Sequence, residues 1–270
     1  AGARETYSIE ALMHDGKALQ SGTTHYFGTG FAEAFGITFQ GKDNVLRNPH
    51  QASWGVSTRL IGSIIMVHGD DNGLVLPPYA APIQIVIIPI QQNKDGILTK
   101  AEEIKARLEK AGYRVVLDKS DRTPGWKYAE YEMKGVPLRL EIGPRDLEKG
   151  NVVIARRVDN KKEYVVDQQI EVEVERLLKE THHVMYRKAK DFLDNHIVPV
   201  CSIEELKKVV DQGGYAKMMW CGHRECEDKI KELTTATARC MPHGDQKHFD
   251  DKCAVCGQEA TKVVYFAKAY

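Results

Sequence analysis

Apolar and polar positions alternate most regularly in the middle third of the chain. Three short apolar runs, which predict buried strands, are separated by two segments with helical spacing: residues 83–88, 99–112, 113–117, 123–134 and 138–142. Thr99 and Glu102 form a capping-box signature at the first helical segment. Thr123 and Pro124 predict an N-cap and a proline at the first helical position of the second. This order of elements predicts an α/β fold.

The flanking segments give further predictions. Residues 168–197 carry the apolar stripe of a long amphipathic helix. Near the N-terminus, Phe27, Phe31 and Phe35 recur every four residues, which predicts one aromatic helix face directed at a core. Residues 61–67 are mainly apolar and predict a buried strand or a core helix.

Composition and charge narrow the class of protein. A chain of 270 residues has room for about two domains. Its formal net charge is zero, so any contact with nucleic acid must come from local patches. The longest apolar stretch, residues 81–90, is broken by Gln84 and Pro89 and falls short of the ~18 residues that span a membrane. The first residues lack the apolar core of a signal peptide. We therefore expect a cytoplasmic protein without a membrane partner.

All six cysteines lie in the last 70 residues. Cys221 with Cys226 and Cys253 with Cys256 form two close pairs, which in a cytosolic chain more often hold a metal than form disulfides. Four thiolates suit a tetrahedral structural zinc ion. Histidines of the same region are weaker rivals for a ligand position. Alternatively, the four thiols are reduced and hold no metal.

Two N-terminal stretches carry candidate binding chemistry. Gln20 to His25 packs an amide, hydroxyls and an imidazole into six positions, where a small polar substrate finds several hydrogen bonds. In residues 53–62, small residues surround one fixed cation, Arg59, whose guanidinium suits a phosphate oxygen. A core segment with one surface arginine explains the second stretch equally well.

Taken together, several stretches resemble prolyl-tRNA synthetases. They are Gly-Lys-Ala-Leu-Gln-Ser-Gly-Thr-Thr-His at 16–25, Ser-Trp-Gly-Val-Ser-Thr-Arg at 53–59, Gly-Asp-Asp-Asn-Gly-Leu-Val-Leu-Pro-Pro at 69–78 and Glu-Ile-Gly-Pro-Arg-Asp at 141–146. The ending in Cys-x-x-Cys and a terminal tyrosine is similar too. The resemblance covers almost the whole chain and is closest to the branch with a zinc-type C-terminal domain.

This resemblance implies an α/β multidomain (α+β) fold with three parts. Residues 1–78 would be a remnant of the antiparallel-sheet catalytic domain of a class II synthetase, including its motif 3 around Arg59. Residues 82–185 would be an α/β anticodon-binding domain with a mixed sheet. Residues 186–270 would be a small α/β domain that binds zinc.

The resemblance also implies the roles of single residues. ATP, with Mg²⁺, would contact Gln20, Thr23, Ser57 and Arg59, and Arg59 would be catalytic because it opposes the charge of the reacting phosphate. Proline would contact His25 and Trp54. The zinc ligands would be the four paired cysteines, Cys221, Cys226, Cys253 and Cys256.

The tRNA would contact Glu141, Arg145 and Asp146. An arginine and carboxylates together offer donors and acceptors for a guanine edge. Without the resemblance, a local ion pair in a solvated turn is the more common explanation of these three residues.

Two functional classes follow from the resemblance. The first is a proline–tRNA ligase, which attaches proline to tRNA(Pro) through prolyl-adenylate and forms a homodimer in the full-length enzyme. The second is a non-catalytic module that binds the tRNA anticodon. Motifs 1 and 2 of class II synthetases do not occur in the 270 residues, so we expect the C-terminal part of such an enzyme and no proline-dependent pyrophosphate exchange by this chain alone.

Overall fold

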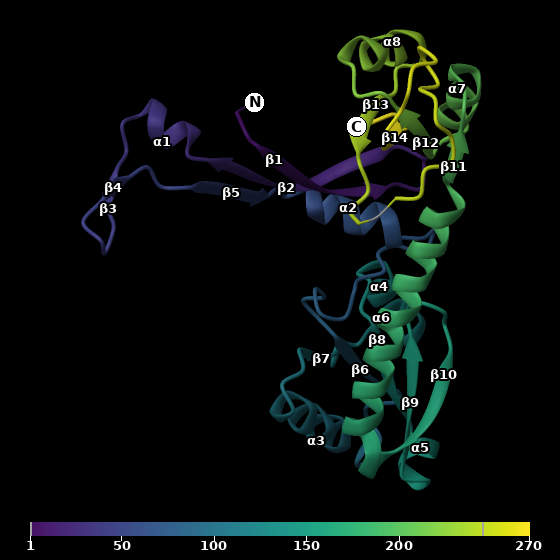
Figure 1. Ribbon diagram of the computed structural model, residues 1–270. Coiled ribbons are helices and arrows are strands. Elements are labelled where there is room, and N and C mark those ends of the chain that lie inside the picture. Colours follow the sequence, from purple (N-terminus) through teal and green to yellow (C-terminus); the bar gives the residue numbers. More distant parts are fainter. Residues whose placement is uncertain (1, 245) are drawn as a thin grey trace. The chain divides into compact units, whose positions relative to one another are not determined.

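The computed structural model describes residues 2–244 and 246–270 and has an α/β fold with mixed sheets, as predicted. The chain forms two compact units (Figure 1). Unit 1 comprises Ala1–Val67 and Phe192–Tyr270, and unit 2 comprises His68–Asp191. The division into domains at 1–78, 82–185 and 186–270 remains a prediction.

Unit 2 is built on a five-stranded sheet in the order β10-β9-β8-β6-β7. The strands are β6 (Ile85–Pro89), β7 (Val115–Leu117), β8 (Leu138–Ile142), β9 (Asn151–Arg156) and β10 (Lys162–Val166). β6 pairs in parallel with β7 and β8, whereas β9 is antiparallel to both β8 and β10. The carboxyl ends of β6, β7 and β8 therefore meet at one edge of the sheet.

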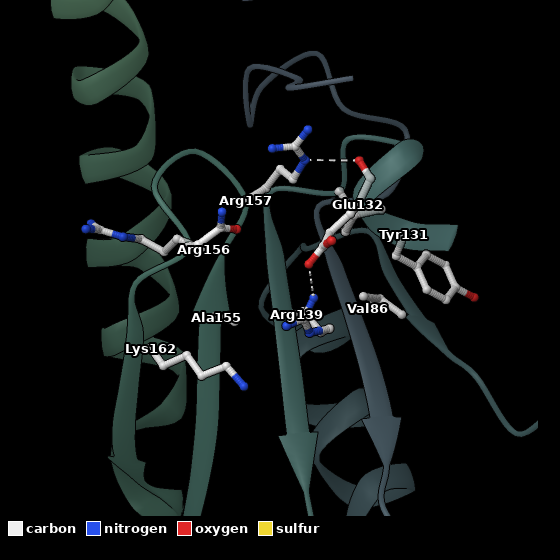
Figure 2. A pocket seen from close by; sticks show the side chains of 10 residues that line it. Val86, Tyr131, Glu132, Arg139, Ala155, Arg156, Arg157 and Lys162 are labelled. Carbon is white, nitrogen blue, oxygen red and sulfur yellow. Dashed lines mark hydrogen bonds and ion pairs between the residues drawn. The ribbon is translucent and has the colours of Figure 1, made fainter. Parts of the chain in front are cut away.

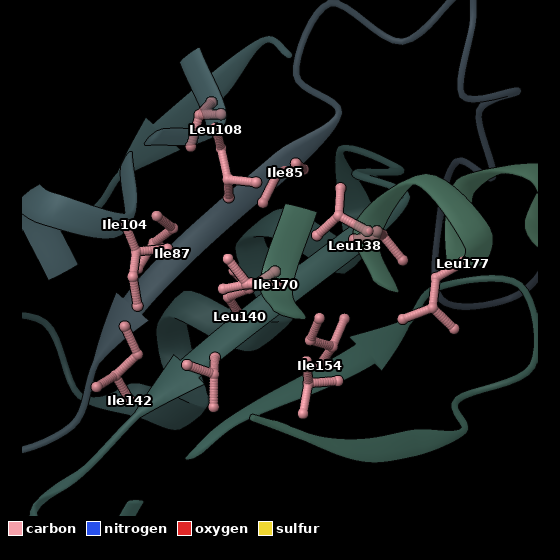
Figure 3. Close-up of a cluster of buried hydrophobic side chains, with 14 of the residues drawn as sticks. Ile85, Ile87, Ile104, Leu108, Leu138, Leu140, Ile142, Ile154, Ile170 and Leu177 are labelled. Atoms are coloured by element: carbon pink, nitrogen blue, oxygen red, sulfur yellow. The ribbon is translucent and has the colours of Figure 1, made fainter. Parts of the chain in front are cut away.

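The helices of unit 2 are α3 (Ile97–Lys110), α4 (Pro124–Met133), α5 (Pro144–Glu148), the 3-10 helix η1 (Asp167–Gln169) and most of α6 (Ile170–Asn195). One face of the sheet packs against α3 and α6 in a continuous apolar core (Figure 3). Its fully buried members include Ile85, Ile87, Ile104, Leu108, Leu138, Leu140, Ile154, Ile170 and Leu177. We call the opposite side of the sheet its outer face. There, Val86 and Ile88 of β6 pack with Tyr128 and Tyr131 of α4.

Local signals explain where these helices begin. The Thr123 hydroxyl accepts a hydrogen bond from the amide of Trp126, and Pro124 opens α4, which confirms the predicted cap. The capping box predicted at Thr99 is wrong, because α3 already begins at Ile97, after Gly96 in the left-handed region with φ +82°. Ile97 is fully buried, so tertiary packing extends this helix beyond the local signal.

The N-terminal part of unit 1 is a three-stranded antiparallel sheet in the order β1-β2-β5. It contains β1 (Glu5–Leu12), β2 (Ala18–Gly28) and β5 (Gln51–Val56), and is followed by α2 (Arg59–His68). Between β2 and β5 lie α1 (Gly30–Ala34) and the two-residue strands β3 (Phe39–Gln40) and β4 (Leu46–Arg47).

Two predictions for this region are wrong. Phe27 belongs to β2, α1 is only five residues long, and Phe35 is 73% exposed, so no aromatic helix face points into a core. Residues 61–67 do form a helix, yet Ile61 is 61% exposed and Ser63 is the buried position of α2.

The C-terminal part of unit 1 has a four-stranded sheet in the order β11-β12-β14-β13. Its elements are β11 (Ile197–Val200), α7 (Ile203–Gln212), β12 (Tyr215–Trp220), α8 (Arg224–Thr234), β13 (Thr237–Cys240) and β14 (Lys262–Ala267). The turn after β1 lies against the turn after α7. A Cβ on Gly16 would lie 2.3 Å from Cα of Gly213, so this approach needs glycine.

Candidate functional site

The loops after β6 and β8 enclose a pocket of about 380 Å³ at the edge where the parallel strands end. Ligand sites of open α/β sheets lie in this position. Glu141, Arg145 and Asp146 all line the pocket, so the structure brings the three residues of the predicted tRNA site together. Asp146 accepts a hydrogen bond from the amide of Gly143 at 2.9 Å, and this fixes the first turn of α5.

Glu141 is engaged by its neighbours and is only 9% exposed. Its carboxylate accepts hydrogen bonds from Arg139 Nε at 3.1 Å and from Lys162 Nζ at 3.0 Å. The hydroxyl of Tyr128 also bonds to it, and burial together with this carboxylate raises the pKa of Tyr128 to about 12. Glu141 therefore holds three donors in place and has little capacity left for a ligand.

Arg145 differs from Glu141 in this respect. Within the described residues, the guanidinium of Arg145 forms no ion pair and donates no hydrogen bond. The five donors of this group therefore remain available to a ligand in the pocket. Sequence reasoning missed Tyr128, Arg139 and Lys162. The spacing of Arg139 and Glu141, which puts both on one face of β8, is the signal that could have found Arg139.

In unit 1, strand register decides which of the predicted ATP and proline contacts share a face. Residues paired across an antiparallel ladder point to the same side. Glu10 pairs with Gln20 and Ile9 with Gly22, so β2 has a bulge at this point. Because of the bulge, Gln20 lies on the same face as Thr23, which pairs with Ser8.

His25 lies on this face too, because it follows Thr23 by two residues. Its Nδ1 lies 3.0 Å from Oγ1 of Thr6. Trp54 pairs with Thr24 and therefore points to the opposite face. There it lines a shallow cavity of about 190 Å³ together with Tyr7, Ile9, Thr24 and Val56. The structure thus does not bring Trp54 and His25 together in one pocket.

Arg59 begins α2 and reaches back toward β2. Its Nη1 lies 3.5 Å from the carbonyl oxygen of Gln20, and its amide donates to Oγ of Ser57 at 3.3 Å. The predicted contacts Gln20, Ser57 and Arg59 therefore lie close together. All three side chains are at least partly exposed, so they are accessible to a ligand.

The four paired cysteines converge, as their spacing predicted. Their sulfur atoms all lie within 4.8 Å of one another, and Cys221 Sγ lies 3.7 Å from Cys226 Sγ and 3.8 Å from Cys256 Sγ. A tetrahedral zinc ion with Zn–S bonds of about 2.3 Å places its sulfurs about 3.8 Å apart, which these distances match. Among the described residues no histidine joins this cluster.

The pKa values of the clustered thiols are shifted in different directions. Burial raises the pKa values of the Cys221 and Cys226 thiols. Burial also acts to raise the pKa of Cys253, but hydrogen bonds from the backbone amides of Cys256, Val255 and Cys221 outweigh it and lower the pKa to about 7. Four adjacent thiolates repel each other, and a divalent cation removes this repulsion.

Among the helices of the described residues, none combines the length and the apolar character that crossing a membrane requires.

Two models of known protein families match the two regions described above, one model for each region. A model of an anticodon-binding domain matches residues 84–181, which contain the five-stranded sheet and its edge pocket. A model of the C-terminal region of prolyl-tRNA synthetase matches residues 203–270, which contain the four-cysteine cluster. Residues 84–181, with the five-stranded sheet and its edge pocket, are therefore similar to an anticodon-binding domain.

Relatives that match over the whole chain point to one kind of synthetase. The chain is 52% identical over 271 residues to "Proline--tRNA ligase 2" of Bacillus cereus (strain ZK / E33L) and 53% identical to "Proline--tRNA ligase" of Ruminiclostridium cellulolyticum. A ligase of Clostridium novyi is 51% identical. Each match covers 100% of this chain and 56% of the relative, so the chain spans about half the length of these curated relatives. The chain is thus similar over its whole length to prolyl-tRNA synthetases.

Proposed function

We propose that this chain binds the anticodon of tRNA(Pro) at the edge pocket of unit 2, as part of an enzyme that attaches proline to that tRNA. The observation that carries the proposal is the guanidinium of Arg145, which has no partner among residues 2–244 and 246–270 and lines a pocket at the carboxyl edge of the sheet. That pocket lies within the residues matched by the anticodon-binding model. A non-catalytic tRNA-binding module is the alternative, which the ligase names of whole-chain relatives do not favour.

In this proposal the residues of the pocket have different roles. Arg145 donates hydrogen bonds to acceptors on a base edge. Glu141 positions Arg139, Lys162 and Tyr128, and Asp146 holds the turn that carries Arg145. A contact of Glu141 with a base would use the acceptor capacity that these neighbours leave free.

For unit 1 we propose an ATP site, with Mg²⁺, on the face of the sheet shared by Gln20 and Thr23, beside Arg59, whose Nη1 lies 3.5 Å from the carbonyl oxygen of Gln20. A cation at this position opposes the charge that develops on the phosphate during adenylate formation. Ser57 orients the start of α2 beside it. His25 lies on the same face and is proposed to contact proline. Trp54 lies on the opposite face of the sheet, so any contact that it makes with proline would lie on that other face.

We further propose that Cys221, Cys226, Cys253 and Cys256 hold one structural zinc ion, which when bound cross-links the ends of the segment between them. The matching sulfur distances support this. No further position is offered to a substrate, so the ion would have no catalytic part. The homodimer of the full-length enzyme and its cytoplasmic location remain predictions from the family resemblance.

The anticodon proposal is tested by direct binding. Arg145→Ala should weaken the binding of transcribed tRNA(Pro) by about 1–3 kcal/mol and relax discrimination at one anticodon position. Arg187→Ala, on the exposed side of α6, is the matched control and should bind like the wild type. Fluorescence anisotropy with anticodon-substituted tRNAs measures both effects. Equal weakening for every tRNA would mean that Arg145 contacts phosphate only.

The enzymatic part is tested separately. Proline-dependent exchange of pyrophosphate into ATP reports prolyl-adenylate formation without any tRNA. In a protein that shows this exchange, Arg59→Ala should lower its rate by at least about 10²-fold, as for the loss of one oxyanion donor. An unchanged rate would remove Arg59 from the active site.

A further inference from the structure

A cavity on the outer face of the five-stranded sheet holds charged groups that satisfy one another (Figure 2). Arg139 donates to the Glu132 carboxylate at 2.8 Å, and Arg157 donates to the Glu132 carbonyl oxygen at 3.0 Å. The four-cysteine cluster of unit 1 is different, because thiols react with oxidants as well as bind a metal. Such a reaction requires access from solvent, so exposure separates the four cysteines from one another.

The thiols of the cluster fall into a buried pair and an accessible pair. Cys226 and Cys253 are 6% and 2% exposed and pack with Met219 in a small apolar core. Cys221 is half-buried, and Cys256 is exposed. An oxidant in water therefore reaches Cys256 most readily and Cys221 next, whereas the buried pair is shielded from it.

A tight turn keeps Cys256 accessible. The amide of Gly257 donates to the carbonyl oxygen of Cys253 at 2.8 Å, and the amide of Cys253 donates to the carbonyl oxygen of Gln258 at 2.8 Å. Gly257 has φ +71°, a left-handed conformation that glycine adopts without strain. These hydrogen bonds hold the turn closed, so that Cys253 stays buried while Cys256 stays exposed.

The two accessible sulfurs are neighbours. Sγ of Cys256 lies 3.8 Å from Sγ of Cys221. A disulfide bond is about 2.0 Å long, so its closure needs a movement of about 2 Å, which rotation of an exposed side chain provides.

The other pairings in the cluster are less favourable. Cys226 Sγ also lies 3.7 Å from Cys221 Sγ, but its burial shields it from the oxidant. The buried sulfur of Cys253 accepts hydrogen bonds from the backbone amides of Cys256, Val255 and Cys221, which hold it in place. The geometry therefore selects Cys221 as the partner of Cys256.

We propose that Cys256 is a site of reversible oxidation by hydrogen peroxide, and that the disulfide it then forms with Cys221 releases the structural zinc ion. The inference rests on the zinc site proposed above and goes beyond it. With four thiolates reduced to two, the cluster no longer offers the tetrahedral set that structural zinc requires.

The oxidation takes two steps. The Cys256 thiolate attacks one oxygen of the peroxide, the O–O bond breaks, and a sulfenic acid and a hydroxide ion form. The Cys221 thiolate then attacks the Cys256 sulfur, the S–S bond forms, and the S–O bond breaks to give a second hydroxide ion. The two thiolates lose two electrons, and the peroxide gains them. A dithiol reductant reverses the change by thiol–disulfide exchange.

The test begins with the full chain, whose zinc content should be about one ion per chain. On addition of hydrogen peroxide, a zinc-sensitive dye should report release of the ion. Dithiothreitol and added zinc should restore the starting content. Hydrogen exchange should show lost protection in residues 200–270 and kept protection in residues 85–181, as expected for removal of the metal.

Peptide mapping locates the disulfide. After alkylation of free thiols, trypsin yields residues 218–224, which contain Cys221, residues 225–229, which contain Cys226, and residues 253–262, which contain Cys253 and Cys256. The oxidised chain should yield the first and third peptides joined. Fragmentation of the joined peptides should place the bond on Cys256.

Two variants test the role of Cys256. Cys256→His keeps a side chain that binds zinc but cannot form the disulfide, so it should release zinc to peroxide at least about tenfold more slowly than the wild type. Cys201→Ser is the matched control, since Cys201 is exposed but lies outside the cluster. It should release zinc at the rate of the wild type. If Cys256→His holds no zinc, the peptide map of the wild type decides.

Each other outcome has a definite meaning. A chain without zinc before oxidation overturns the zinc proposal, and this inference with it. Zinc that stays bound while peroxide oxidises Cys201 overturns the modification site alone and leaves the zinc site standing. A disulfide within residues 253–262, or one between Cys221 and Cys226, also overturns it. Equally fast release from Cys256→His and the wild type would show that Cys256 is not the thiol that reacts.

Discussion

The five-stranded sheet of unit 2 and the three-stranded sheet of unit 1 bury their apolar side chains to different extents. In unit 2, α3 and α6 cover one face, and Ile87 and Leu140 have no exposed surface. In unit 1, Ile9 is 57%, Val56 68% and Trp54 75% exposed, although each lies on a strand. The amino-acid types are alike, so the difference comes from what covers each sheet.

The comparison suggests different sources of stability. Unit 2 has one large core between sheet and helices, to which burial of apolar area contributes directly. Unit 1 has several separate clusters of buried apolar side chains, and an ion pair and a group of cysteines also join its segments. Arg239 of β13 pairs with Glu10 of β1 at 2.8 Å, and the four cysteines bring the ends of residues 221–256 together. We therefore expect unit 1 to depend on a few specific interactions.

Removal of the metal should have the largest effect, confined to the C-terminal part of unit 1. Structural zinc contributes apparent free energies of about 10–16 kcal/mol in zinc-finger peptides. Chelation should therefore abolish protection from hydrogen exchange in residues 200–270 and leave residues 85–181 protected. Cys256→Ser should lower the zinc content from about one per chain, whereas Cys201→Ser, outside the cluster, should not. Full protection of metal-free residues 200–270 would contradict the zinc proposal.

Arg239→Ala should have the next largest effect on the free energy of unfolding, because it removes the cation that pairs with the Glu10 carboxylate. The side chain of Glu10 is only 6% exposed. Breaking such a buried pair costs about 3–5 kcal/mol. Arg224→Ala is the control, since Arg224 pairs with Asp228 at 3.7 Å with side chains 87% and 65% exposed, and such pairs contribute about 0–1 kcal/mol. Urea unfolding followed through Trp220, with the other two tryptophans replaced by Phe, measures both. Equal small losses would show that the pair does not hold β1 to β13.

One matched pair of isoleucines compares the two sheets directly. Ile87→Ala should destabilise unit 2 by about 2–5 kcal/mol, because it leaves a cavity in the core. Ile9→Ala, on β1, should change the stability of unit 1 by no more than about 0.5 kcal/mol. Trp126 reports unfolding of unit 2 and Trp220 that of unit 1. A large loss for Ile9→Ala would mean that this exposed face is covered in solution.

The smallest expected effect is a pH dependence of unit 2. Hydrogen bonds from Arg107 lower the pKa of Glu171 below its usual 4.5, against an opposing effect of burial. A carboxylate with a lowered pKa stabilises the fold above its unfolded pKa and loses this contribution as the pH falls through its folded pKa. Stability should therefore decline below about pH 4.5, and Arg107→Gln should flatten the decline. Parallel pH curves for both proteins would exclude this pair as the cause.

Local signals in the sequence were sufficient for much of unit 2. Leu138–Ile142 forms β8 as predicted, Thr123 and Pro124 begin α4, and the long amphipathic segment is α6. Caps, prolines and apolar periodicity act over one or two turns, so they can be identified without knowledge of the tertiary structure. The close spacing of Cys253 and Cys256 likewise predicts a metal-binding pair, whereas the less regular spacing of Cys221 and Cys226 needs the family resemblance in support.

The arrangement of the sites depended on long-range pairing. The bulge in β2 sets which face Gln20 shares with Thr23 and His25, and the pairing of Trp54 with Thr24 places it on the other face. A shift of one residue in register reverses the face of every side chain, and local sequence does not determine register.

Burial was also decided by tertiary structure. The phenylalanines around Phe31 have helical spacing, but Phe27 lies half-buried on a strand, and Phe31 and Phe35 are 37% and 73% exposed. The sequence predicts Glu141 as a tRNA contact, but only the tertiary structure shows that its oxygens accept hydrogen bonds from Arg139 and Lys162. The sequence by itself determined which residue types and local elements are present. The tertiary structure decided which of them are covered and which are free to bind, because both depend on neighbours far away in the chain.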